Sequence, residues 1–216
     1  MLNRHYRIFV GQLDRIRDRA NLLEAEVAAL PSWKKRYLSQ ALIFDLWTRW
    51  SVFARNVILA SCLGTATRSG NLIAPRVGDN SWQRLGYLAK NANSRPSKIS
   101  PTGRLNSMYA EPTWGDISKL PDYVKVINPN NIAQLLAAFS LSSLRSPKDL
   151  QIIRNACAHR HVELLVGDIR RIRIYYFSPT LNDPSDIVWQ VEANSKILAI
   201  YCWLDNLSDL AEQMTL

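Results

Sequence analysis

Two long stretches of helical periodicity, separated by a single proline, constrain the fold of this chain more than any other feature. Residues 4–29 place apolar side chains on one face and charged side chains on the other, which predicts an amphipathic helix. The expected apolar face consists of Ile8, Leu13, Ile16, Leu22, Leu23 and Val27. Pro31 ends this helix, and residues 34–63 form a second helical pattern that is apolar on most sides, with Gly64 just past its end. We therefore expect two long helices, the second lying at the centre of the fold or against a partner subunit.

The chain changes character between residues 65 and 130, where glycine, serine and asparagine are frequent and proline recurs. The prolines are Pro75, Pro96, Pro101, Pro112, Pro121 and Pro129. They exclude a long regular helix, yet tryptophan and tyrosine side chains indicate that the region packs down. We predict an irregular insertion with short helices.

Helical signals return after the insertion. Residues 130–143 form a short pattern, and Ser146 is a suitable N-cap for the next helix, with Pro147 at its first position. Residues 163–177 alternate in a β-like way around a Gly-Asp turn, and residues 186–213 have helical spacing. The predicted fold class is mainly α: one domain over residues 1–216, with the irregular insertion at about 65–130 and a short β-hairpin.

The composition is that of a soluble globular protein, with 47% hydrophobic residues, 21% charged residues and a formal net charge of +9. A basic excess favours an anionic partner, most often nucleic acid, although a basic surface without such a partner is the alternative. Cys62, Cys157 and Cys202 lie far apart, which argues against a disulfide framework and a cysteine-type zinc site. The N-terminal segment is too charged for a signal peptide or membrane anchor, so we expect a cytoplasmic protein without a membrane span.

One otherwise apolar segment carries an arginine, an asparagine and a histidine in the spacing R-N-x-x-x-H: Arg154, Asn155 and His159. Five residues at about 100° each separate the arginine and histidine side chains by roughly 140° around a straight helix. Either His159 lies at a frayed helix end where the chain turns, or a second copy of the motif completes the site in a twofold dimer. The small residues between them, 156–158, would permit close approach of such a mate.

This pattern near the end of a helix, in a helical chain of this size, resembles the HEPN superfamily. Arg154, Asn155 and His159 match that family's R-x-x-x-x-H motif, including the polar residue that often follows the arginine. The long N-terminal and C-terminal helices suit its helical bundle. The branch with a tyrosine two positions after the histidine is not matched, because His161 stands there.

The resemblance implies a metal-independent endoribonuclease that needs no cofactor and acts on RNA as a homodimer. Such proteins serve in toxin–antitoxin and antiviral defence systems, so an antitoxin or regulatory protein is a further expected partner. His159 would act as general base or general acid, since an imidazole pKa near neutrality suits both tasks. Arg154 would stabilise charge on the scissile phosphate, and Asn155 would orient the histidine or bind the phosphate.

Several readings of these residues stay open at the level of sequence. Arg154 would, in a purely structural role, pair with an acid such as Asp149 or Glu163, and His159 would then be a helix-end histidine. A basic, aromatic cluster is either an RNA-guiding surface or a solvated strand face; it comprises Arg170, Arg171, Arg173 and Tyr175. Asp45 and Arg49 are spaced for an ion pair within the second helix or for a place in the site wall. The alternative to an enzyme is a non-catalytic helical module that binds nucleic acid or a protein.

Overall fold

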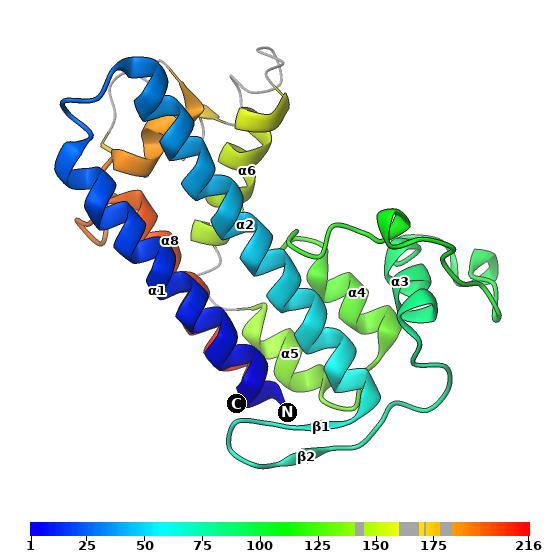
Figure 1. The fold of residues 1–216 in the computed structure, drawn as a ribbon. Helices are drawn as coiled ribbons and strands as arrows, with labels where there is room; N and C mark the ends of the chain where they lie inside the picture. The colour runs from blue at the N-terminus through cyan, green and yellow to red at the C-terminus, as the bar shows by residue number, and fades with distance from the viewer. Residues whose placement is uncertain (141–144, 160–168, 171, 178–182) are drawn as a thin grey trace. The chain divides into compact units, whose positions relative to one another are not determined.

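The structure, a computed structural model, describes residues 1–140, 145–159, 169–170, 172–177 and 183–216 and is mainly α-helical (Figure 1). Its elements in chain order are α1 (Leu2–Glu26), α2 (Ser32–Leu63), β1 (Thr65–Ala66), β2 (Leu72–Ile73), α3 (Trp82–Lys90), η1 (Pro96–Lys98), η2 (Met108–Ala110), α4 (Leu120–Ile127), α5 (Ile132–Ala138), α6 (Arg145–His159), η4 (Pro184–Trp189) and α8 (Ala199–Thr215). The η elements are 3-10 helices. The predicted fold class, mainly α with a short hairpin, is confirmed, although the hairpin that the structure shows is β1–β2 and not residues 163–177.

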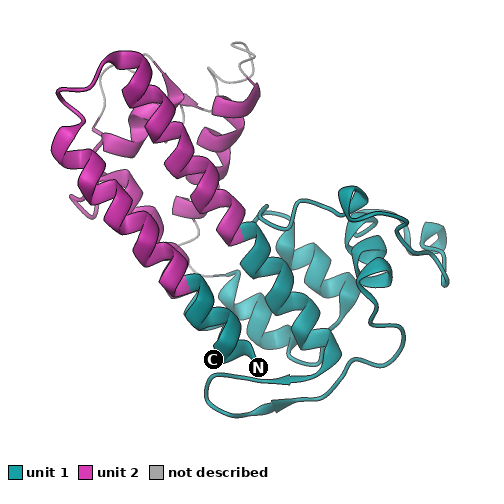
Figure 2. Cartoon of the chain, in the orientation of Figure 1, with its two compact units in different colours: residues 1–9, 51–142, 210–216 teal, residues 10–50, 143–209 magenta. Residues whose placement is uncertain are grey.

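The chain forms two compact units, which Figure 2 distinguishes by colour. Unit 1 comprises residues 1–9, 51–142 and 210–216, and unit 2 comprises residues 10–50 and 143–209. The boundaries between the units fall inside α1, α2 and α8, so each of these helices contributes to both units. The R-N-x-x-x-H motif lies on α6 and belongs to unit 2.

In unit 1, α2 ends where the sequence predicts. Gly64 adopts a left-handed conformation with φ of +83°, and a Cβ on it would lie 2.8 Å from Cγ of Pro75. Glycine is the residue that adopts this φ without strain and that has no Cβ to collide with Pro75. The chain then enters a small antiparallel sheet in which Thr65 pairs with Ile73. The short helices that follow pack in succession, α3 on α4 and α4 on α5. Helices α3 and α4 lie within the region predicted to be an irregular insertion, and α5 lies within the helical pattern predicted at residues 130–143.

The buried face of α1 differs in part from the predicted one. Ile8 and Leu22 are 51% and 71% exposed, whereas Leu13 and Ile16 are buried as expected. The side chains that α1 buries completely or nearly so are Leu2, Phe9, Leu13, Ile16 and Ala20. These positions follow one another at spacings of three, four or seven, which keeps them on one side of the helix.

The predicted hairpin at residues 163–177 is not formed by the residues described there. Residues 169–170 and 172–173 are helical, and Tyr176 makes an isolated antiparallel bridge to Glu192. Ile172 and Tyr176 are both 3% exposed, while Ile174 between them is 72% exposed. Residues 172, 174 and 176 would share one face of a strand, so the exposure of Ile174 between two buried side chains does not fit the predicted strand. Residues 163–168 and Arg171 lie outside the described residues.

The predicted helix at residues 186–213 is also shorter than expected, because α8 begins at Ala199. Asp183 caps the short 3-10 helix η4 through a capping box with Asp186. The carboxylate of Glu192 then accepts the backbone N–H groups of Asn194 and Ser195. These local bonds hold the chain in turns, in place of the helical hydrogen bonds that the apolar spacing alone predicts.

Candidate functional site

The first turns of α6 are held to their surroundings by buried polar contacts. Asp149 is 3% exposed, and its carboxylate accepts a hydrogen bond of 2.8 Å from the hydroxyl of Tyr176. That hydroxyl in turn accepts a hydrogen bond of 3.0 Å from Nε1 of Trp203 on α8. Arg145 forms an ion pair with Glu192. The helix that carries the motif is therefore fixed at its N-terminal end by groups from three other segments.

Burial and hydrogen bonding move the pKa values of the two carboxyl groups in this cluster in opposite directions. Burial raises the pKa of Asp149 to about 6, against the lowering effects of the Tyr176 hydroxyl and of Arg145. Burial also opposes ionisation of Glu192, but hydrogen bonds from Ser195 and the charge of Arg145 outweigh it, and the pKa of Glu192 is lowered. Arg145 is therefore chiefly the partner of Glu192.

Ser146 does not cap α6 as predicted. It lies inside the first turn of the helix and is 4% exposed. Its hydroxyl accepts a hydrogen bond of 2.8 Å from Nδ2 of Asn206. The hydroxyl of Ser146 is therefore used in a contact with α8, and not as the N-cap that the sequence pattern predicts.

Arg154 lies in the third turn of α6 and is half-buried. Its Nη1 donates a hydrogen bond of 3.0 Å to Oδ1 of Asn155, and its guanidinium carbon lies 5.8 Å from the centre of the Phe44 ring on α2. Within the described residues, its Nε is buried and has no hydrogen-bond partner. Asp149 is occupied by Tyr176 and Arg145, so it is not the structural partner of Arg154, and Glu163 lies outside the described residues.

His159 is the last residue of α6 and is exposed. Because α6 is helical through this residue, its side chain leaves the helix roughly 140° away from that of Arg154. No hydrogen bond or ion pair links it to Arg154 or Asn155 in the part of the chain described. One α6 helix therefore joins Arg154 to Asn155 but does not bring His159 to them.

The small residues between arginine and histidine are only partly available to a second subunit. Ala156 and Cys157 are 2% and 8% exposed and belong to the protomer's own core. Burial raises the pKa of the Cys157 thiol to about 12. Ala158 and His159 are exposed. A partner helix could reach the end of α6, but not the whole small-residue stretch as the sequence suggests.

The residues of the predicted basic cluster have different surroundings. Arg170 is exposed and Arg173 is half-buried, both in short helical segments instead of a strand, and Arg171 lies outside the described residues. Tyr175 has one ring face covered by Arg145, whose guanidinium carbon lies 4.1 Å from the ring centre. Arg170 is therefore the described member of the cluster that most fully faces solvent.

The polar residues of α2 form ion pairs. Arg49 donates to Asp45 at 3.0 Å, as the spacing predicts, and Arg19 of α1 donates to the same carboxylate at 2.9 Å. Arg55 makes two hydrogen bonds of 2.6 Å to Glu111. The residue of α2 that does approach the motif is Phe44, which sequence reasoning missed. No signal in the sequence marks it, because its role depends on how α2 packs against α6.

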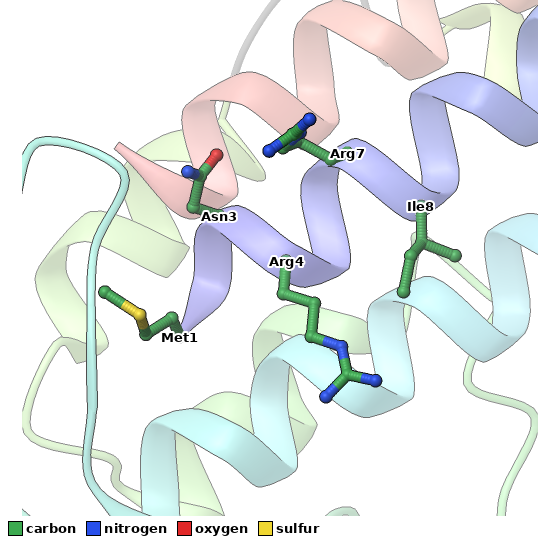
Figure 3. A pocket seen from close by; sticks show the side chains of 5 residues that line it. All are labelled: Met1, Asn3, Arg4, Arg7 and Ile8. Atoms are coloured by element: carbon green, nitrogen blue, oxygen red, sulfur yellow. The ribbon is translucent and has the colours of Figure 1, made fainter.

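A pocket of about 320 Å³ lies in unit 1, at the start of α1 (Figure 3). Its lining residues are Met1, Asn3, Arg4, Arg7 and Ile8. Two arginines one turn apart make it basic, but it contains no side chain of the motif. His5, in the same turns of α1, is half-buried, and burial lowers its pKa.

Comparisons with protein-family models, with curated proteins and with solved structures find no match to this chain. In the described ranges, no three histidine, cysteine, aspartate or glutamate side chains are grouped so that they could hold a metal ion. None of the described helices is both long enough and apolar enough to cross a membrane.

Proposed function

We propose that this protein is a metal-independent endoribonuclease of the HEPN type, acting in toxin–antitoxin or antiviral defence. The observation that carries the proposal is the state of the Arg154 side chain. It is oriented by Asn155 and Phe44, yet its buried Nε finds no hydrogen-bond partner among the residues that the structure describes. A buried N–H donor without an acceptor is costly, and a phosphate oxygen is an acceptor that guanidinium groups bind well.

In the proposed reaction the 2′-oxygen of the ribose attacks the adjacent phosphorus, and the bond from phosphorus to the 5′-oxygen breaks. A histidine takes the proton of the 2′-hydroxyl, and a second histidine gives a proton to the departing 5′-oxygen. Arg154 stabilises the charge that develops on the phosphate. The products are a 2′,3′-cyclic phosphate and a 5′-hydroxyl.

The second histidine comes from a second copy of the chain. His159 is exposed at the end of α6 and points away from Arg154 of its own helix, so a twofold mate is the simplest source of a complete set. The mate would meet the exposed end of α6, since Ala156 and Cys157 are already buried.

The first test is cleavage of single-stranded RNA by the purified protein in excess EDTA. We expect cleavage to continue and the products to carry 2′,3′-cyclic phosphate ends. His159→Ala should abolish cleavage without unfolding the protein, because an exposed side chain contributes little to packing. Arg154→Lys, which keeps the charge but loses the planar fork, should lower kcat by about 100-fold or more. Activity that disappears with EDTA and returns with magnesium would disprove the mechanism, and binding without cleavage would favour the non-catalytic module.

A mixed dimer of wild-type and His159→Ala chains, purified through two different tags, tests the shared site. A site that needs both histidines should leave the mixed dimer far below half of wild-type activity. About half activity, or an active monomer by light scattering, would show that each chain carries a complete site.

A further inference from the structure

Two aromatic side chains stand exposed on the first turns of α2. Trp33 is 69% exposed and Tyr37 is 67% exposed. Large aromatic side chains are usually buried over much of their surface, and clusters of them left in solvent mark binding surfaces. Both residues belong to unit 2, as does the R-N-x-x-x-H motif.

These two side chains share a face of α2 with the ring that supports Arg154. Around the helix, positions 37 and 44 lie within about 40° of position 33, and the three positions span about 17 Å along the axis. Phe44, at the far end, is half-buried and carries the guanidinium of Arg154 on its ring at 5.8 Å. We call Trp33, Tyr37 and Phe44 the aromatic face; it leads from the start of α2 to Arg154.

The opposite side of α2 is the one that packs inside unit 2. Ser39 is 1% exposed and accepts a hydrogen bond of 2.7 Å from Nε1 of Trp189 in η4. Ser39 lies about 200° from Tyr37 around the helix. Because α2 turns the side of Ser39 toward the interior of unit 2, Trp33 and Tyr37 on the other side face solvent.

The charges around the aromatic face suit an anionic polymer. Lys34 is exposed, and Arg36, on the other flank, is exposed while paired with Asp183 at 2.9 Å. The first turn of α2 contains no acidic residue. The helix N-terminus adds partial positive charge to these cations.

We infer that the aromatic face is a stacking surface on which single-stranded RNA lays successive bases as its backbone approaches Arg154. This inference rests on the proposed ribonuclease function and adds to it the form of the substrate and the route by which it is held. Stacking on aromatic rings requires bases that are not stacked in a duplex, whereas Lys34 and the helix N-terminus attract the backbone of any nucleic acid. The aromatic face thus selects single strands over double strands.

The test measures binding apart from chemistry. A fluorescein-labelled 2′-O-methyl oligonucleotide of about ten nucleotides matches the usual footprint of a stacking site and cannot be cleaved through a 2′-hydroxyl. Its dissociation constant is measured by fluorescence anisotropy in low salt. Trp33→Ala and Tyr37→Ala should each raise the dissociation constant about tenfold, and Trp33→Phe should change it by no more than about twofold. Binding of a duplex of the same length should not respond to these changes.

Two controls separate stacking from other effects of the substitutions. Tyr109 is 102% exposed in unit 1, and Tyr109→Ala removes a still more accessible ring that is not on the aromatic face, so affinity should stay at the wild-type value. Trp33→Leu keeps an apolar side chain without a ring system and should bind as weakly as Trp33→Ala.

The outcomes distinguish this inference from the proposed function. Wild-type affinity in Trp33→Ala and Tyr37→Ala overturns the stacking surface even if the wild-type protein cleaves RNA. Wild-type affinity in Trp33→Leu overturns it as well, and so does loss of the dimer in Trp33→Ala, which would assign the aromatic face to the subunit contact. Weakened binding in a protein that cleaves no RNA supports the stacking surface and refutes the nuclease.

Discussion

At the scale of single residues, the buried carboxyl group of Asp149 affects stability through its ionisation. Its pKa is raised from 3.8 to about 6, with burial as the first cause, so the folded protein holds this proton more tightly than the unfolded chain. The fold is therefore more stable at low pH, where the carboxyl group is protonated in both the folded and the unfolded state, than at neutral pH. This extra stability is lost as pH rises from about 4 to 6, because the unfolded chain releases the proton first.

Asp149→Asn should remove this loss. Because each pKa unit corresponds to about 1.4 kcal/mol, the variant should gain up to about 3 kcal/mol relative to the wild type between pH 4 and pH 7. The asparagine oxygen can still accept the Tyr176 hydroxyl, so the comparison isolates ionisation. Denaturant unfolding at several pH values measures the difference. Parallel curves for Asp149→Asn and the wild type would contradict the prediction.

Arg55 and Glu111 offer a second prediction at this scale. Glu111 is largely buried, with 8% of its side chain exposed, and it accepts two hydrogen bonds from Arg55 and one of 2.6 Å from Trp114. Removing one member leaves the other charged group without its partner inside unit 1. Arg55→Met should lower the free energy of unfolding by about 3 kcal/mol, measured by urea denaturation. Lys125→Met, at an exposed ion pair, should change it by less than about 1 kcal/mol.

At the scale of elements, the end of α2 depends on one glycine. Gly64→Ala should cost about 1–2 kcal/mol for the left-handed backbone and about 1–3 kcal/mol more for the contact with Pro75. Gly70 is the matched control, because its φ is +90° but a Cβ on it meets nothing within 4 Å. Gly70→Ala should therefore show the backbone cost alone, and equal losses in the two variants would mean that Pro75 moves aside freely.

The elements also show which parts of the structure the sequence could predict. The helices α1 and α2 are long enough for periodicity to identify them, and Pro31 and Gly64 mark their ends. The segments after residue 168 could not be read in the same way, because spacings such as that of Ile172 and Tyr176 fit a strand and a helix equally. In the site, the contact of Arg154 with Asn155 follows from their adjacency. The contact with Phe44 depends on the packing of α2 against α6, which no local pattern specifies.

At the scale of the whole molecule, the net charge of +9 makes the proposed binding of RNA sensitive to salt. Each phosphate of a single strand that is neutralised by lysine or arginine contributes about 0.7 to the slope of log affinity against log salt. Replacing Arg170 and Arg173 by alanine together should reduce that slope by up to about 1.4, measured by anisotropy over a salt series. An unchanged slope would show that Arg170 and Arg173 do not contact the RNA phosphates. Lys125→Ala is the control for loss of positive charge elsewhere in the chain.

The division of the chain into two units has a consequence for its genetics. The chain passes between the units after residues 9, 50, 142 and 209, so neither unit is encoded by one uninterrupted stretch. The shortest contiguous gene fragment that includes all of unit 2 runs from residue 10 to residue 209 and carries residues 51–142 of unit 1 with it. A library of gene fragments screened for soluble expression should therefore recover neither unit alone. A single proteolytic cut between residues 51 and 142 would likewise leave the two segments of unit 2 on different fragments.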